Sequence, residues 1–112
     1  MKNWKNDISI ELRRAKEAER VGNEGRLRTI ARRIAGMALK QLKSQLPQLQ
    51  LDSDYLSALY AVKKSGAVPQ HVADAATRLV TRIAEDFKSP SKDPLGDAMI
   101  IVEYVERQLK RQ

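Results

Sequence analysis

Apolar residues recur at intervals of three and four along most of the chain, which is the spacing of one face of an α-helix. The pattern predicts five helical segments, over about residues 3–21, 25–45, 53–65 and 69–87, and from residue 94 toward the end of the chain. There is little sign of the strict alternation that a half-buried strand produces. We therefore expect an all-α protein.

Turn and cap residues separate the predicted helices. Gly22 suits the left-handed position that follows a helix, so it closes the first segment. Asp52 or Ser53 is a suitable N-cap for the short third helix, and Asp93 for the fifth, with Pro94 at its first position. Four long helices and one short one predict an antiparallel up-and-down four-helix bundle with an additional short helix, built as a single domain over residues 1–112.

The second helix is divided into two sides when its residues are placed about 100° apart around the helix axis. Most of its apolar residues lie on one side and its basic residues on the other, although Leu39 and Gln41 break this division. Several of its residues are small enough for a neighbouring helix to approach closely. They are Ala31, Ala35, Gly36 and Ala38.

Charge is distributed unevenly along the chain. The net charge of +7 divides into +1 for residues 1–24, +6 for residues 25–51 and 0 for residues 52–112, and residues 25–51 contain no acid. The six bases of this stretch are Arg26, Arg28, Arg32, Arg33, Lys40 and Lys43. Ordinary surface helices alternate charges of both signs, whereas a run of bases on one helix can neutralise successive phosphates. We predict an anion- or nucleic-acid-binding face here, with a solvated helix face as the alternative.

Aromatic side chains give little support for stacking of nucleobases. The chain has five aromatic residues, Trp4, Tyr55, Tyr60, Phe87 and Tyr104. Most of them occupy core positions of the predicted helices, so we expect few to be available to a single strand.

The sequence excludes several kinds of catalytic and metal site. It has no Cys and one His, so it can form neither a disulfide, nor a thiolate metal site, nor a two-His metal site within one chain. Asp74 lies three residues after His71, but one His near one carboxylate is weak evidence for catalysis, and we expect His71 to lie at the surface or to cap a helix. The acids Glu85, Asp86, Asp93 and Asp97 surround a linker without the pattern of a calcium loop. We predict no metal, no cofactor and no catalytic residue.

The beginning of the chain is polar and helical rather than a signal peptide, and no apolar run approaches the ~20 residues of a membrane span. We therefore expect a cytoplasmic protein that does not enter a membrane.

The first 45 residues resemble the opening of the HEPN (higher eukaryotes and prokaryotes nucleotide-binding) domain family. The resemblance rests on Trp4, a helix that ends in KEAER at residues 16–20, a Gly-Asn turn, and AGMALK at residues 35–40. It implies a helical bundle, usually dimeric, and many family members are metal-independent RNases. Their signature is an Arg followed four to six residues later by a His. Residues 65–67, which precede His71 by that distance, are Ser, Gly and Ala, so the nuclease motif is absent.

The fifth helix has a wider apolar arc than one bundle face requires, because Ile100 and Ile101 adjoin Met99 and Val102. We predict that Ile100 and Ile101 contribute to a homodimer or partner contact.

Together these features predict a non-catalytic, HEPN-like helical bundle that is dimeric and binds an anionic partner through the second helix. That partner is RNA, another nucleic acid or an acidic protein. One alternative is a protein–protein adaptor, or one subunit of a toxin–antitoxin-like pair, that binds no nucleic acid. A second alternative is a divergent metal-independent RNase.

Overall fold

The structure is a computed structural model that describes residues 3–81 and 92–111. These residues form five α-helices and one 3-10 turn, and no strand occurs among them. The helices are α1 (Trp4–Arg20), α2 (Glu24–Lys40), α3 (Tyr55–Lys64), α4 (Gln70–Val80) and α5 (Pro94–Lys110), and the 3-10 turn is η1 (Pro47–Leu49). The prediction of an all-α protein is confirmed.

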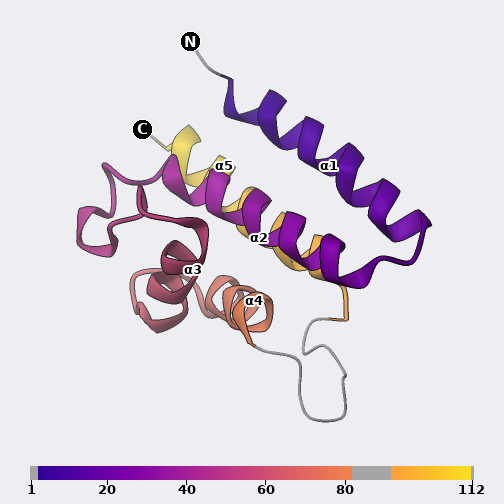
Figure 1. Ribbon diagram of the computed structural model, residues 1–112. Coiled ribbons are helices and arrows are strands. Elements are labelled where there is room, and N and C mark those ends of the chain that lie inside the picture. Colours follow the sequence, from indigo (N-terminus) through magenta and orange to yellow (C-terminus); the bar gives the residue numbers. More distant parts are fainter. Residues whose placement is uncertain (1–2, 82–91, 112) are drawn as a thin grey trace.

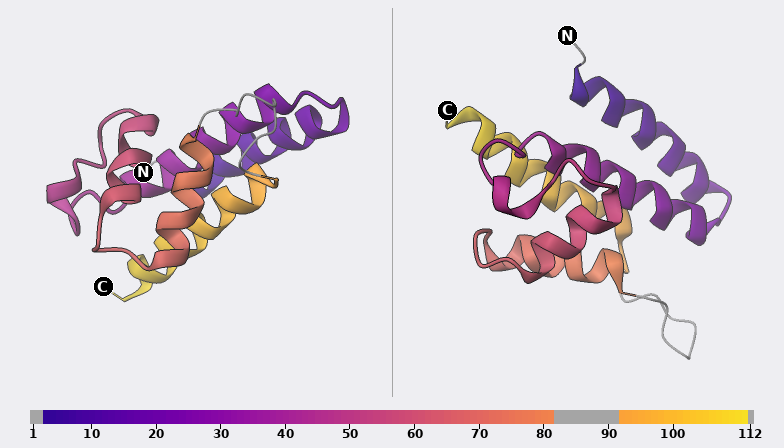
Figure 2. Two further views of the ribbon diagram at one scale, coloured as in Figure 1. Left: turned by 90° about the horizontal axis from the view of Figure 1, so that it is seen from below. Right: turned by 60° about the vertical axis from the view of Figure 1, so that its left-hand side comes forward.

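Helix α2 is the central element of the fold (Figure 1). It packs against α1, α3 and α5, and it also touches α4. Helix α1 runs antiparallel to α2, whereas α3 and α4 pack on each other and cross α2 and α5 rather than lying alongside them (Figure 2). The antiparallel up-and-down four-helix arrangement is therefore not confirmed.

The central position of α2 explains the residue that broke its predicted two-sided pattern. Leu39 lies on the basic side of the helix wheel, yet it is fully buried. Neighbouring helices cover α2 on that side as well, so its apolar positions extend around most of the helix. The residues with the largest fully buried side chains come from several elements: Ile34, Leu39, Leu42, Leu51, Leu59, Leu79 and Ile101.

Local signals placed two helix ends well. Gly22 has a φ of +73°, as expected of the residue that follows the end of α1. Asp93 caps α5 through a hydrogen bond from the backbone N–H of Gly96 to its Oδ1 at 2.9 Å, and Pro94 is the first helical residue. Both predictions are confirmed. Each depends only on the conformational preferences of adjacent residues, so the sequence was sufficient to make it.

Three other helix ends differ from prediction. Helix α2 ends at Lys40, because residues 41–45 form tighter turns in which, for example, the N–H of Leu42 bonds the carbonyl of Leu39 at 2.9 Å. Asp54, rather than Asp52 or Ser53, caps α3. Helix α4 ends at Val80 because the next residue is extended, and the remainder of the predicted segment lies outside the described residues.

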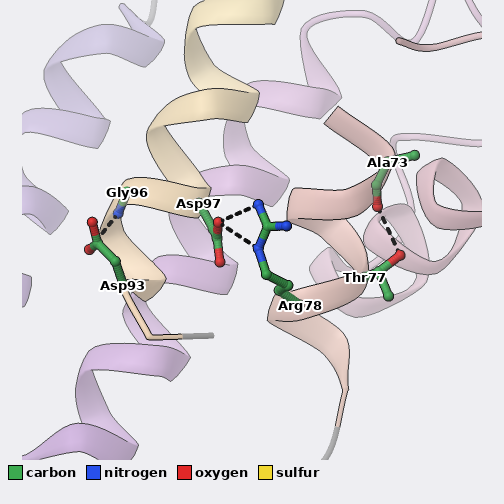
Figure 3. A network of polar contacts seen from close by, with 6 residues as sticks. All are labelled: Ala73, Thr77, Arg78, Asp93, Gly96 and Asp97. Atoms are coloured by element: carbon green, nitrogen blue, oxygen red, sulfur yellow. Dashed lines mark hydrogen bonds and ion pairs between the residues drawn. The ribbon is translucent and has the colours of Figure 1, made fainter. Parts of the chain in front are cut away.

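An ion pair joins α4 to α5 (Figure 3). The Nε and Nη2 atoms of Arg78 donate to the same carboxylate oxygen of Asp97, at 3.0 and 2.8 Å. Asp97 is only 7% exposed, so its charge depends on such partners. The hydrogen bond to Asp97 raises the pKa of Arg78 above its ordinary value.

Replacing Arg78 with Ala is expected to lower the free energy of unfolding by about 1–2 kcal/mol, because it removes hydrogen bonds to a buried carboxylate. Chemical denaturation of the variant and the parent chain measures this loss. Arg13→Ala is the matched control, since Arg13 is exposed on α1 and its loss is expected to change stability by less than about 0.5 kcal/mol. Equal losses in the two variants would show that the ion pair does not hold α4 on α5.

Candidate functional site

The six bases of residues 25–51 do not form one exposed face, because helices surround α2. Arg26, Lys40 and Lys43 are exposed, and they lie toward the two ends of the segment. The three arginines between them, Arg28, Arg32 and Arg33, are buried or half-buried. Whether each base can contact a partner therefore depends on the position of its own side chain.

Arg32 donates a hydrogen bond to the C-terminal end of α4. Its Nε donates to the carbonyl oxygen of Leu79 at 2.5 Å, in the last turn of α4. The final carbonyls of a helix lack partners within the helix and carry partial negative charge, so a guanidinium stabilises them. Burial lowers the pKa of Arg32, the charge of Arg28 lowers it further, and Tyr60 acts in the opposite direction.

Arg33 takes part in a bridge between α1 and α2. Its Nη1 lies 3.3 Å from Oε2 of Glu11, while Nη1 of Arg14 lies 3.1 Å from Oε1 of the same carboxylate. Glu11 is only 8% exposed, and the hydrophobic pattern of α1 gave no sign of a buried acid. One acid from α1 thus offsets part of the positive charge of α2.

Arg28 is the most buried of the six bases, at 8% exposure. Its Nε is buried and has no hydrogen-bond partner among the described residues. Arg28 therefore offers little surface to a partner in this conformation, whereas Arg32 and Arg33 remain partly accessible.

Helix α3 presents aromatic and aliphatic side chains to solvent. Tyr55, Leu56 and Tyr60 are 41%, 42% and 39% exposed. The expectation that most aromatic residues are buried in the core is therefore wrong for Tyr55 and Tyr60. Helix α3 has only ten residues, and Ala58, Leu59 and Val62 already supply its buried side, so the other apolar residues stay outside.

Tyr55 lies directly over α2 at Gly36. A Cβ atom added to Gly36 would lie 2.6 Å from Cβ and 2.7 Å from Cγ of Tyr55. Real Cβ atoms do not approach carbon atoms so closely, so only Gly fits at this position. The expected close approach of a neighbouring element to the small residues of α2 is confirmed at Gly36.

Two hollows meet at Asp54 and Tyr55, and we refer to them together as the α2–α3 groove. The smaller hollow, of about 270 Å³, is lined by Thr29, Arg32, Arg33, Asp54, Tyr55 and Leu56. The larger hollow, of about 530 Å³, is lined by Trp4, Asp7, Gly36, Met37, Lys40, Gln41, Ser53, Asp54 and Tyr55. Tyr55 and Asp54 thus separate a hollow with two arginines from a hollow with one lysine and a second aromatic residue.

Both signs of charge are present in the groove. Asp54 is engaged as the N-cap of α3, since the backbone N–H and the hydroxyl of Ser57 donate to its two carboxylate oxygens, each at 2.8 Å. Asp7 lies in the first turn of α1, where a negative charge is favourable. Three bases, Arg32, Arg33 and Lys40, line the hollows together with these two acids. Outside the two hollows, the ammonium of Lys63 lies 5.7 Å from the centre of the Tyr60 ring.

The hydrogen bonds from Ser57, first the backbone N–H and then the hydroxyl, lower the pKa of Asp54 below its ordinary value. A depressed pKa in the folded protein means that the cap contributes stability above the unfolded pKa of about 4. This contribution is lost as the pH falls through the lower, folded pKa. Asp54→Ala is therefore expected to destabilise the protein most near pH 7 and progressively less below about pH 4, as thermal denaturation at a series of pH values would show. A loss independent of pH would mean that the carboxylate charge is not involved.

The remaining predicted sites are placed as follows. His71 is exposed, and no hydrogen bond joins it to Asp74 in the described residues; Asp74 instead accepts a hydrogen bond from Nε2 of Gln70 at 2.8 Å. Asp93 caps α5, as expected, and Asp97 pairs with Arg78. Glu85 and Asp86 lie outside the described residues. Within residues 3–81 and 92–111, no group of three His, Cys, Asp or Glu residues could hold a metal ion.

The two isoleucines assigned to a partner contact differ in position. Ile101 is fully buried in the core, whereas Ile100 is half-buried and packs against it. Helix α5 uses its wide apolar arc to pack on both α2 and α4. Any partner contact through this part of α5 therefore depends on Ile100, and the homodimer stays a prediction.

Comparison with known proteins identified no relative. No family model matches the chain, and neither curated proteins nor solved structures gave a match. No helix in the described part of the chain combines the length and the hydropathy that crossing a membrane requires.

Proposed function

We propose that this protein is a non-catalytic helical binding module that holds single-stranded RNA or DNA in the α2–α3 groove. The exposure of Tyr55 between two hollows that contain basic residues carries this proposal. Arg32 and Arg33 line one hollow, and Lys40 lines the other. The proposed binding surface is therefore the junction of α2 with α3, and not the whole basic side of α2 that the sequence predicted.

The groove combines the two interactions that single strands use. Aromatic side chains stack on nucleobases and tolerate any sequence, while nearby bases neutralise the phosphates. Tyr60, also on α3, lies near Arg32, and Lys63 lies over its ring. Trp4 and Tyr55 line the larger hollow together with Lys40, and Tyr60 lies one helical turn from Leu56, which lines the smaller hollow with Arg32 and Arg33.

A single strand fits this surface better than a duplex. Bases within a duplex are already stacked, so exposed rings gain little from them, whereas unstacked bases can pack on tyrosine. Helix α2 is covered on most sides by other helices and cannot enter a major groove as a recognition helix. We propose no sequence specificity.

The HEPN relationship and the homodimer are retained as further proposals. The α1–α2 hairpin with its Gly22–Asn23 turn is the feature that supports the relationship. We also retain the up-and-down four-helix bundle as a proposal, and the antiparallel pair formed by α1 and α2 supports it.

Fluorescence anisotropy of a labelled single-stranded oligonucleotide tests the proposed function. Tyr55→Ser and Tyr60→Ser are each expected to weaken binding by about five- to a hundredfold, because one stacked base is lost. Lys40→Gln is expected to reduce the slope of log K against log salt by about 0.7. The matched controls on α1, Ile10→Ser and Lys16→Gln, remove an exposed apolar residue and an exposed base outside the groove and should change little.

Failure to bind any oligonucleotide at low salt would contradict the proposal and favour the adaptor alternative, with an acidic protein as the partner. Binding weakened equally by the groove variants and the α1 controls would indicate diffuse attraction by the net charge of +7 rather than a groove. Shortened RNA products in the same samples that disappear when one arginine, such as Arg33, is replaced by Gln would favour the divergent RNase, which would act through basic residues rather than His.

A further inference from the structure

A second polar groove lies between the beginning of α4 and the last three turns of α5, and it has no residue in common with the α2–α3 groove. It has a volume of about 270 Å³. Its lining consists of Pro69, His71, Ile100, Glu103, Tyr104, Arg107, Gln108 and Arg111. We infer that this groove binds a terminal phosphate, the dianionic group of a phosphate monoester or of free phosphate.

The cationic groups of this groove are available to a ligand. Arg107 and Arg111 lie one helical turn apart, so their side chains share a face of α5. Among the described residues, Arg107, Arg111 and His71 take part in no ion pair and no side-chain hydrogen bond. Guanidinium groups bind phosphate oxygens through pairs of N–H donors, and two such groups match the charge of a dianion.

Helix α4 contributes further donors at the same place. Pro69 is its N-cap and has no side chain that could accept from the first N–H groups. The backbone N–H groups of Gln70 and His71 accordingly have no partner within the described chain. Unpaired N–H groups at a helix N-terminus favour an anion, and here they adjoin a groove that already contains two unpaired arginines.

The remaining lining residues define which anion fits. Tyr104 is half-buried, and burial raises the pKa of its hydroxyl, so it stays protonated and can donate a hydrogen bond. Glu103 places one negative charge at the groove, which leaves an excess of one positive charge when His71 is neutral. The volume is below that of typical small-molecule sites, about 300–1,000 Å³, and suits a single phosphate group rather than a whole nucleotide.

The only His of the chain lies in this groove and provides the probe. The imidazole proton signals of His71 in an NMR spectrum need no further assignment. Titration with inorganic phosphate at constant ionic strength is expected to shift these signals saturably, because the bound dianion lies against the imidazole ring. Arg107→Gln and Arg111→Gln are each expected to weaken binding about tenfold or more. Lys110→Gln, which removes an exposed charge from the same helix outside the groove, should change binding less than twofold.

A further comparison distinguishes a free phosphate from the phosphorylated end of a strand. It uses free phosphate and a short oligonucleotide that carries either a 5′-phosphate or a 5′-hydroxyl. A response to the 5′-phosphorylated strand but not to the 5′-hydroxyl strand would assign the groove to a strand end. A response to free phosphate alone would support a small-molecule phosphate site. The inference is overturned if phosphate shifts His71 no more than chloride does, if Lys110→Gln weakens binding as much as Arg107→Gln, or if the 5′-hydroxyl strand is equally effective.

Discussion

Replacing Leu39 with Ala is expected to lower the free energy of unfolding by about 2–5 kcal/mol, the largest stability effect that we predict for a single substitution. Leu39 is fully buried at the centre of the fold, and its truncation removes apolar contacts and leaves a cavity between helices. Small domains are stable by only about 5–15 kcal/mol, so the variant should unfold at a clearly lower denaturant concentration.

Ile10→Ala is the matched control for Leu39→Ala, because Ile10 is an exposed aliphatic residue on α1. Its truncation is expected to cost less than about 0.5 kcal/mol. Chemical denaturation monitored by circular dichroism measures both variants. If Leu39→Ala cost as little as Ile10→Ala, the central position of α2 would be wrong.

Adding one methyl group at Gly36 is expected to affect both stability and binding. The new Cβ would lie within 2.7 Å of the Cβ and Cγ atoms of Tyr55, so α3 or the Tyr55 ring must move. Overpacking of this kind lowers the free energy of unfolding by about 1–3 kcal/mol, whereas the better helix propensity of Ala raises it by at most about 1 kcal/mol. A folded Gly36→Ala protein should therefore be less stable and should bind oligonucleotides more weakly.

A double variant separates these two effects of Gly36→Ala. In a Tyr55→Ala background the obstructing ring is absent, so adding the methyl group at Gly36 should cost less, and the coupling between the two sites is expected to exceed about 0.5 kcal/mol. Binding should stay weak in the double variant, because the stacking ring has been removed. Independent effects on stability would contradict the direct contact between Gly36 and Tyr55.

The parts of the fold that depend on neighbouring residues could be predicted from the sequence. The positive φ of Gly22 and the Asp93–Pro94 start of α5 follow from conformational preferences of single residues. The end of α2 could not be placed in this way, because the turns after Lys40 still allow helix-like hydrogen bonds three residues apart.

The candidate site depended on contacts between distant residues, which periodicity does not reveal. The basic side of α2 was visible in the sequence, but the burial of Arg28 and the bond from Arg32 to the end of α4 arise from helices that follow later in the chain. The exposure of Tyr55 and Tyr60 was also missed. A usable signal was present, since α3 has more apolar residues than one buried face of a ten-residue helix can accommodate.

The most direct test of the account follows the fluorescence of Trp4, the only Trp of the chain and part of the lining of the larger hollow. A single strand that occupies the α2–α3 groove should quench Trp4 saturably, with a midpoint equal to that from anisotropy and a steep dependence on salt. Tyr55→Ser should reduce the affinity measured by both signals alike. Binding seen by anisotropy without any change in Trp4 would place the nucleic acid elsewhere, and the absence of both signals at low salt would contradict nucleic-acid binding by this protein.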